Sequence, residues 1–414
     1  MAKLAIKGGN SVRTKPIPKW PPKTEREKEL LLQVLESGSW GGFPSPNRFA
    51  KKFNEMFAKA CDAKYAVACA NGTVSLEMCL RAGGLKAGDE VIVTPYTWLA
   101  TAGAVVTTNG VPVFADVKES DYTINPDIVE AKITSKTKAI ICVHLGSSIA
   151  DLDRLKDIAA KHHLLLIEDC AHMHGAKWRG KGVGSHGDFG SFSMQSSKLM
   201  TSGEGGAVTT NDPVFHDKLH SLVNCGRKEP PYDGFDGYLL GWNYRIGEFQ
   251  AAVLIAQLEK LEERTAERAK NAAYLTEQLR KISGLKVIEM DPRTTTPGHY
   301  QYIFKYDPAG FKGLHRDKFL DAMIAEGFII DGDFYVPLPG RDIFPVSADY
   351  YPAIRERYGD AITAKNAEDL PVTRKAAFEE AVWVHYPYLM GGYELIDEFI
   401  EAIHKIQTNV DELL

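Results

Sequence analysis

The chain has no apolar run long enough to span a bilayer, and its first residues lack the apolar stretch of a secretory signal. It has six cysteines among 414 residues, and none stands in the CxxC spacing of metal and redox sites. Basic residues form no long cluster and the net charge is −5, which argues against nucleic-acid or anionic-membrane partners. These absences predict a cytoplasmic protein with buried free thiols and no bound metal.

The composition, 44% hydrophobic and 25% charged, is typical of a globular protein, and the length exceeds one ordinary domain. From Ala66 to Val208, short apolar runs alternate with helical patterns, which predicts a mostly parallel sheet covered on both faces. The pattern changes near Lys270. We therefore expect a large α/β domain with an N-terminal arm over residues 1–265, and a smaller α+β domain over residues 266–414.

Three further segments have patterns that predict regular structure. Thr24 and Glu27 have the spacing of a capping box, which predicts a helix up to Ser37. Several apolar stripes over residues 247–279 predict one long helix that links the two domains. Alternating aromatic residues over 300–306 predict a strand with Tyr300, Tyr302, Phe304 and Tyr306 on one face.

A carboxylate pair follows a short apolar run in the middle of the chain. The run, residues 164–167, has the length of a buried parallel strand and ends in Glu168 and Asp169. Open α/β sheets bind ligands at the carboxyl ends of their strands, so this pair is a candidate for a ligand contact.

A single lysine, Lys198, follows a second apolar run (residues 189–194) and a serine-rich turn, and a glycine-rich segment, residues 203–206, comes next. Glycines let the backbone approach a ligand closely, and hydroxyls can bind a phosphate. Pyridoxal phosphate (PLP) needs a lysine for a Schiff base and a carboxylate, here Asp169, that keeps its ring nitrogen protonated. The spacing alone fits a PLP lysine and a solvated loop lysine about equally well.

Two other strand ends carry weaker signals. Asn71, Gly72 and Thr73 follow a predicted strand and begin a helix, whose unpaired N–H groups can bind an anion. Trp98 stands near the start of another helix, again after a predicted strand. A tryptophan is more often part of a core, but this position favours a ligand contact.

Three linked blocks, residues 168–176, 191–198 and 203–206, resemble the signature of the DegT/DnrJ/EryC1/StrS family of sugar and cyclitol aminotransferases. The resemblance extends from Trp20 to the C-terminal helix. It implies the type I PLP-dependent aminotransferase fold, PLP as cofactor, and a homodimer whose subunits share their active sites.

The resemblance also implies roles for individual residues. Lys198 would bind PLP and carry the proton, Asp169 would stabilise the protonated ring, and His172 would orient Asp169 or the phenolic oxygen of PLP. The remaining contacts to PLP would come from residues at several strand ends and from the partner subunit: Gly72, Thr73, Trp98, Ser193, Gln195 and the partner subunit's Asn243.

Candidates for substrate contact are fewer. Arg245 would bind the α-carboxylate of the amino donor, because a guanidinium matches a carboxylate bidentately, and Arg227 is its rival. His144 is a substrate candidate or a buried core histidine. His299 is the last candidate, from the smaller domain.

The segment Gln195-Ser196-Ser197 before the lysine resembles the branch of glutamine:scyllo-inosose aminotransferases and 3-amino-5-hydroxybenzoate synthase. We therefore expect transfer of an amino group from L-glutamine or L-glutamate to a cyclic ketone such as scyllo-inosose. The alternatives are transfer to a nucleotide-linked keto sugar and a dehydratase or lyase reaction like that of the hydroxybenzoate synthase. Lys198 argues for transamination, because the dehydratase branch has histidine there.

Overall fold

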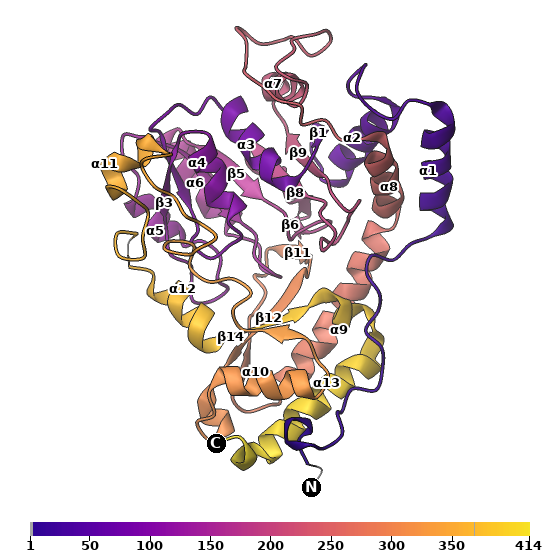
Figure 1. Ribbon diagram of the computed structural model, residues 1–414, viewed down its shortest axis with the longest axis vertical. Helices are drawn as coiled ribbons and strands as arrows, with labels where there is room; N and C mark the ends of the chain where they lie inside the picture. Colours follow the sequence, from indigo (N-terminus) through magenta and orange to yellow (C-terminus); the bar gives the residue numbers. More distant parts are fainter. Residues whose placement is uncertain (1–2, 368) are drawn as a thin grey trace.

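The computed structural model describes residues 3–367 and 369–414, so residues 1 and 2 of the expected N-terminal arm lie outside the described part. A seven-stranded sheet in the order β1-β9-β8-β5-β4-β2-β3 forms the centre of the larger part (Figure 1). Its strands are β1 (Tyr65–Cys69), β2 (Glu90–Val93), β3 (Val111–Phe114), β4 (Thr137–Val143), β5 (Leu165–Asp169), β8 (Phe189–Ser193) and β9 (Gly206–Thr210). Within this sheet β9 is antiparallel to both neighbours and every other pair is parallel, which confirms the predicted mostly parallel sheet.

Helices cover both faces of this sheet because its strands are apolar on both sides. On β2, Ile92 packs into one core, whereas Val91 and Val93 pack into the core on the opposite face. The helices of the first core are α1 (Glu25–Ser37), α2 (Arg48–Ala60), α5 (Pro126–Ala131), α6 (Leu152–His162) and α8 (Glu248–Glu259). Those of the second core are α3 (Gly72–Ala82), α4 (Ala100–Thr107) and α7 (Pro213–Val223).

The smaller part is built on an antiparallel sheet in the order β10-β12-β14-β13. Its elements are β10 (Leu285–Val287), β12 (Gln301–Tyr306), β13 (Ile330–Asp331), β14 (Ala381–His385), α9 (Leu261–Leu279), α10 (Arg316–Ala325) and α13 (Gly392–Thr408). Tyr302, Phe304 and Tyr306 share the predicted face and lie in the core under these helices. Tyr300 does not, because it precedes the strand and packs against Leu199 and Tyr386 instead.

The predicted single helix over residues 247–279 is wrong, because α8 ends at Glu259 and α9 begins at Leu261. Lys260 between them has φ −110° and ψ 0°, outside the helical region. The Glu248 carboxylate accepts the N–H groups of Phe49 and Ala50 at 2.7 and 2.8 Å, which binds α8 to the start of α2. The break lets α9 leave this core and run along the smaller part (Figure 1).

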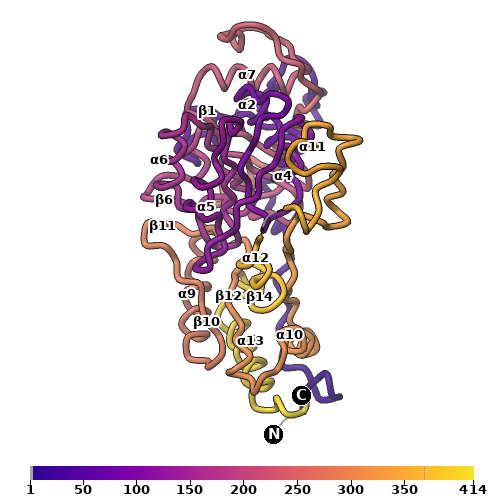
Figure 2. The backbone as a smooth tube through the Cα atoms, turned by 90° about the vertical axis from the view of Figure 1, so that its left-hand side faces the viewer, coloured from indigo at the N-terminus to yellow at the C-terminus, as the bar shows by residue number. Residues whose placement is uncertain are grey.

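The expected division between residues 265 and 266 stays a prediction, and it falls inside α9. Two segments pack across it. Leu4, Val12 and Ile17 contact the core of the smaller part. The N-terminal segment runs along α13, where Thr14 donates to Glu398 and Lys405 donates to the Asn10 carbonyl (Figure 1). Conversely, residues 338–367, including α11 (Arg355–Tyr358), and Leu370 pack against the larger part, as the side view shows (Figure 2).

A third, three-stranded sheet joins β11 (Thr294–Thr296) to β6 (Lys177–Trp178) and β7 (Lys181–Gly182), and so connects the two parts. The capping box at Thr24 and Glu27 is confirmed at the start of α1. None of the helices in the described part of the chain is both long and apolar enough to cross a membrane.

Candidate active site

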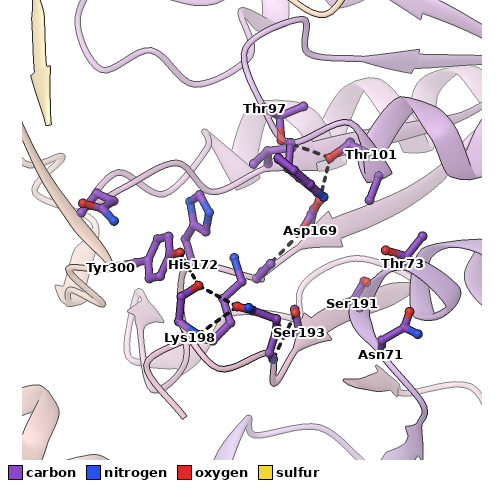
Figure 3. A pocket seen from close by; sticks show the side chains of 18 of the residues that line it. Asn71, Thr73, Thr97, Thr101, Asp169, His172, Ser191, Ser193, Lys198 and Tyr300 are labelled. Atoms are coloured by element: carbon purple, nitrogen blue, oxygen red, sulfur yellow. Dashed lines mark hydrogen bonds between the residues drawn. The ribbon is translucent and has the colours of Figure 1, made fainter. Parts of the chain in front are cut away.

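A cavity of about 860 Å³ lies where the carboxyl ends of the parallel strands face the smaller part (Figure 3). Residues from both parts line it. From the larger part these include Asn71, Gly72, Thr73, Trp98, Thr101, Asp169, His172, Ser193, Gln195, Lys198 and Glu204; from segments after residue 299 they include Tyr300, Gln301, Phe334, Tyr335, His385 and Tyr386. The cavity thus brings together the predicted cofactor residues except Asn243.

Lys198 stands on a turn that the side chain of Gln195 holds in shape. Gln195 Oε1 accepts the Ser197 N–H at 2.9 Å and the Ser197 hydroxyl at 2.7 Å, and the Gln195 carbonyl accepts the Lys198 N–H at 2.8 Å. Lys198 Nζ lies 4.5 Å from the centre of the Tyr300 ring. Burial lowers the pKa of Lys198 to about 8, although the charge of Asp169 opposes that shift.

Asp169 ends β5 with its side chain directed into the cavity (Figure 3). It is 7% exposed, and it accepts the Thr101 hydroxyl at 2.9 Å and the Ala171 N–H at 3.3 Å. Burial raises the pKa of this carboxyl, and the two hydrogen bonds and Lys198 only partly offset the shift. A cation bound against Asp169 would therefore stabilise its ionised form.

Glu168 does not share this role, although the sequence pairs the two carboxylates. Successive side chains on a strand face opposite ways, and Glu168 is fully buried behind the sheet. It accepts the N–H groups of Gly184, His186 and Gly187, each at 2.8 Å. Burial alone would raise its pKa, but hydrogen bonds and the neighbouring His144 hold the pKa below its ordinary value.

His144 is therefore a structural residue, and its prediction as a substrate contact is wrong. The side chain is fully buried and does not line the cavity. Its Nδ1 accepts the Ala150 N–H at 3.2 Å, so Nε2 carries the proton and donates to Glu168 at 3.2 Å.

His172 lines the cavity, but its hydrogen bonds do not reach Asp169. Nδ1 accepts the Gly146 N–H at 3.3 Å, so Nε2 carries the proton and donates to the Tyr335 hydroxyl at 3.0 Å. The ring stacks on Tyr300 with 4.2 Å between centres. Burial holds its pKa well below the ordinary value, so the ring is neutral. The structure therefore does not show His172 orienting Asp169.

The first turn of α3 supplies the predicted anion site. Asn71 Oδ1 caps the helix by accepting the Val74 N–H at 3.0 Å, and the first backbone N–H groups remain for a ligand. A Cβ on Gly72 would lie 2.5 Å from the Cβ of Ser193, so glycine lets the two strand ends meet. Thr73 and Ser193 line the cavity beside this turn.

Besides His144, four predicted residues lie away from the cavity of this chain. Arg245 donates to Asn224 at 2.9 Å, and the Arg227 guanidinium lies 4.2 Å from the centre of the Phe43 ring. Asn243 is exposed on the same surface. His299 is 4% exposed and faces a separate cavity of about 260 Å³, where Nδ1 hydrogen-bonds to the Ser147 hydroxyl at 2.8 Å. His299 is therefore wrong as a substrate contact.

Sequence reasoning missed two groups of cavity residues. Thr101 had a signal, because Thr97 and Thr101 are four residues apart after a strand and face each other at 3.1 Å. The second group is the wall formed by Tyr335, His385 and Tyr386, for which the sequence gives no signal. These residues reach the cavity only because segments distant in sequence pack together.

The sheet order is that of the larger part, and one cavity at its strand ends brings together the half-buried Lys198, the buried Asp169 and the start of α3. The chain belongs to the DegT/DnrJ/EryC1/StrS aminotransferase family, whose profile matches residues 21–386.

Relatives and solved structures agree over nearly the full length. A protein of Streptoalloteichus tenebrarius, named provisionally as an L-glutamine:3-amino-2,3-dideoxy-scyllo-inosose aminotransferase, is 49% identical over 100% of this chain and 99% of its own. The L-glutamine:scyllo-inosose aminotransferase of Streptomyces griseus is 37% identical over 99% of each chain. The crystal structure of 3-amino-5-hydroxybenzoic acid synthase superposes with a TM-score of 0.80 at 31% identity, covering 95% of this chain and 99% of that one.

The low pKa of Lys198 predicts unusual reactivity in the cofactor-free protein. We expect its labelling by an amine-directed reagent to rise with pH around a midpoint near 8, because only the neutral amine reacts. Exposed lysines should show midpoints near about 10.4. Asp169→Asn removes the charge that favours the ammonium, so the midpoint should fall further. Competitive labelling read by mass spectrometry measures this, and a Lys198 midpoint near that of exposed lysines would contradict the assignment.

Proposed function

We propose that this chain is a PLP-dependent aminotransferase that moves the amino group of L-glutamine to 3-amino-2,3-dideoxy-scyllo-inosose, a cyclitol ketone. The observation that carries the proposal is Lys198, a lysine of lowered pKa in a cavity that also holds a buried carboxylate and a helix N-terminus. The names of the relatives that match the full chain support the reactants.

The residues present fit PLP. Because residue 72 is a glycine, Ser193 can lie directly beside the first turn of α3, and both line the cavity. The free N–H groups of that turn would bind the phosphate of PLP. Asp169, buried and of raised pKa, suits a protonated ring nitrogen, and the exposed face of Trp98 at the cavity wall suits stacking on the ring. Thr73, Ser193 and Gln195 would complete the contacts.

Bound PLP would supply an electron-accepting ring that makes the Cα–H bond of an amino acid labile. Lys198 acts first as the group that binds the cofactor, then as the base and acid that moves the proton, and a pKa near 8 suits both tasks. Thr101 holds Asp169 in place through its hydroxyl. His172 stays neutral and holds Tyr335, which closes the cavity on the side of the smaller part.

The charges that line the cavity favour an uncharged or cationic ring over a nucleotide-linked sugar. Within one chain, no arginine occurs among the described residues that line it, and Lys198 is committed to the cofactor. The arginine that a second copy would supply is assigned to the carboxylate of the amino donor. Asp169 and Glu204 are the carboxylates there. A nucleotide diphosphate needs cations to offset its charge, whereas a cyclitol needs hydrogen bonds and stacking faces.

Half-reactions followed by absorbance test this proposal. L-glutamine should convert the PLP form of the enzyme to the pyridoxamine form, and 3-amino-2,3-dideoxy-scyllo-inosose should convert it back. Lys198→Ala should still bind PLP through the phosphate contacts but lose turnover by about 10³-fold or more, because the proton carrier is gone. If only nucleotide-linked keto sugars restore the PLP spectrum, the acceptor is wrong. Loss of ammonia without amino transfer would instead favour a lyase.

We also propose that two copies of the chain share their active sites. Large apolar side chains are exposed around Asn243 and the two arginines: Trp40 (54%), Phe43 (53%), Leu240 (70%) and Trp242 (51%). Arg227 and Arg245 both lie over the Phe43 ring. A second copy covering this surface would bury it and would bring the partner's Asn243 and an arginine to the cavity. That arginine would bind the carboxylate of the amino donor.

Mixed dimers test the sharing. Lys198→Ala and Asn243→Ala proteins should each be weakly active or inactive, and after subunit exchange about a quarter of the wild-type activity should return, because one site of each mixed dimer keeps both residues. Exchange is verified with differently tagged subunits. If exchange is verified and no activity returns, the shared site is contradicted. Gln407→Ala mixed with Lys198→Ala is the control for the loss of activity that comes from mixing with an inactive subunit alone.

A further inference from the structure

The side chain of Gln301 presents an unused hydrogen-bond acceptor at the active-site cavity. Gln301 is 1% exposed and lines the cavity, and its Oε1 has no partner among the described residues. A buried amide oxygen without a donor costs free energy, and a ligand that supplies the donor removes that cost. The atom is therefore a candidate contact for a reactant.

The register of the small sheet places this amide. Gln301, the first residue of β12, lies directly opposite His385, the last residue of β14. Asp331 ends β13 and pairs with Trp383, two residues before His385. Because residues two apart on a strand share a face, Gln301, His385 and Asp331 lie on the face turned away from the core of the smaller part.

A chain of hydrogen bonds orients the amide. His385 Nε2 lies 2.7 Å from Asp331 Oδ2, and a carboxylate only accepts, so this nitrogen carries the proton. The Gln301 amide nitrogen can only donate and lies 3.2 Å from His385 Nδ1, so Nδ1 is the acceptor in this pair. With that nitrogen committed, Oε1 is the atom left for a ligand, and the carboxylate at the far end strengthens it as an acceptor.

The acceptor stands close to the reacting centre. Tyr300, the residue before Gln301, has its ring centre 4.5 Å from Lys198 Nζ, and both His385 and Gln301 line the same cavity. A reactant held at Lys198 can therefore reach the Gln301 side chain. The group that fits Oε1 best is a donor, and a charged N–H donor forms a stronger bond than a hydroxyl.

We propose that Gln301 Oε1 binds an N–H group of a reactant, with His385 and Asp331 as positioning residues. The inference rests on the proposed function, in which two reactants carry such a group: the carboxamide of L-glutamine and the ammonium of 3-amino-2,3-dideoxy-scyllo-inosose. Both occupy the same cavity in turn. Each has an oxygen counterpart without that N–H, L-glutamate for the first and 2-deoxy-scyllo-inosose for the second.

Single-turnover kinetics on the cofactor-loaded enzyme test the contact with both pairs. Gln301→Leu should lower kcat/KM by about 10- to 100-fold for the reactant that uses the contact, and by less than about threefold for its oxygen counterpart. Gln301→Glu keeps an acceptor and should stay close to wild type with the N–H reactant. Gln407→Leu removes two amide hydrogen bonds far from the cavity and is the matched control. It should leave kcat/KM unchanged for each N–H reactant relative to its oxygen counterpart.

The outcomes separate the two sources. A loss confined to L-glutamine assigns the donor's carboxamide, and a loss confined to the amino-ketone assigns the ring ammonium. Calorimetry of the amino-ketone in the Lys198→Ala background, with and without Gln301→Leu, gives the same test without turnover. Equal losses with both members of each pair, or a larger loss with L-glutamate, overturn the proposal.

Two further results keep the proposal apart from other failures. If Gln301→Leu does not fold, His385→Phe should show the same discrimination at a smaller size, because the amide then loses its orientation, and absence of discrimination there overturns the proposal. A wild-type enzyme that accepts no inosose contradicts the proposed acceptor. The L-glutamine and L-glutamate pair then still decides whether Gln301 binds the donor.

Discussion

A carboxylate that is buried loses its hydration, and hydrogen bonds or a cation must replace it. The two carboxylates at the end of β5 differ in how far the protein itself supplies that replacement. Glu168 is fully buried and receives three backbone N–H groups and His144, which fixes residues 184–187 behind the sheet. Asp169 has a raised pKa, one hydroxyl and one weak backbone bond. The protein thus satisfies the structural carboxylate internally and leaves the other one to be completed by a cationic group in the cavity.

The groups around Asp169 in the cavity are subject to the same loss of hydration. Lys198 faces the same apolar walls as Asp169, and its pKa falls for the same reason that the pKa of Asp169 rises. The start of α3 supplies a site for negative charge at the opposite side of the cavity (Figure 3). The smaller part adds aromatic rings, His385 and the amide of Gln301 to the cavity, and the described residues that it contributes to the lining include no arginine, lysine or carboxylate.

The sequence was informative where chemistry follows a strand directly. The apolar runs before Asp169 and around Ser193 predicted both strands, and the linked blocks identified the family that the comparisons confirm. It was uninformative where geometry depends on alternation or on distant packing. Neighbouring carboxylates look equivalent in a sequence, although a strand turns one of them away from the cavity. Likewise, nothing in the sequence shows that His144, which directly follows β4, is fully buried against Glu168. The break at Lys260 has no local signal, since both helices have helical patterns.

The central claim is that Lys198 is the residue that carries the cofactor. Borohydride reduction of the PLP-loaded protein, followed by peptide mapping, tests it most directly, because reduction fixes the cofactor on the lysine that holds it. The account predicts one pyridoxyl group per chain, on the peptide that contains Lys198, and none on that peptide in Lys198→Ala. A pyridoxyl group on any other lysine of the wild-type protein, with Lys198 unmodified, would contradict it.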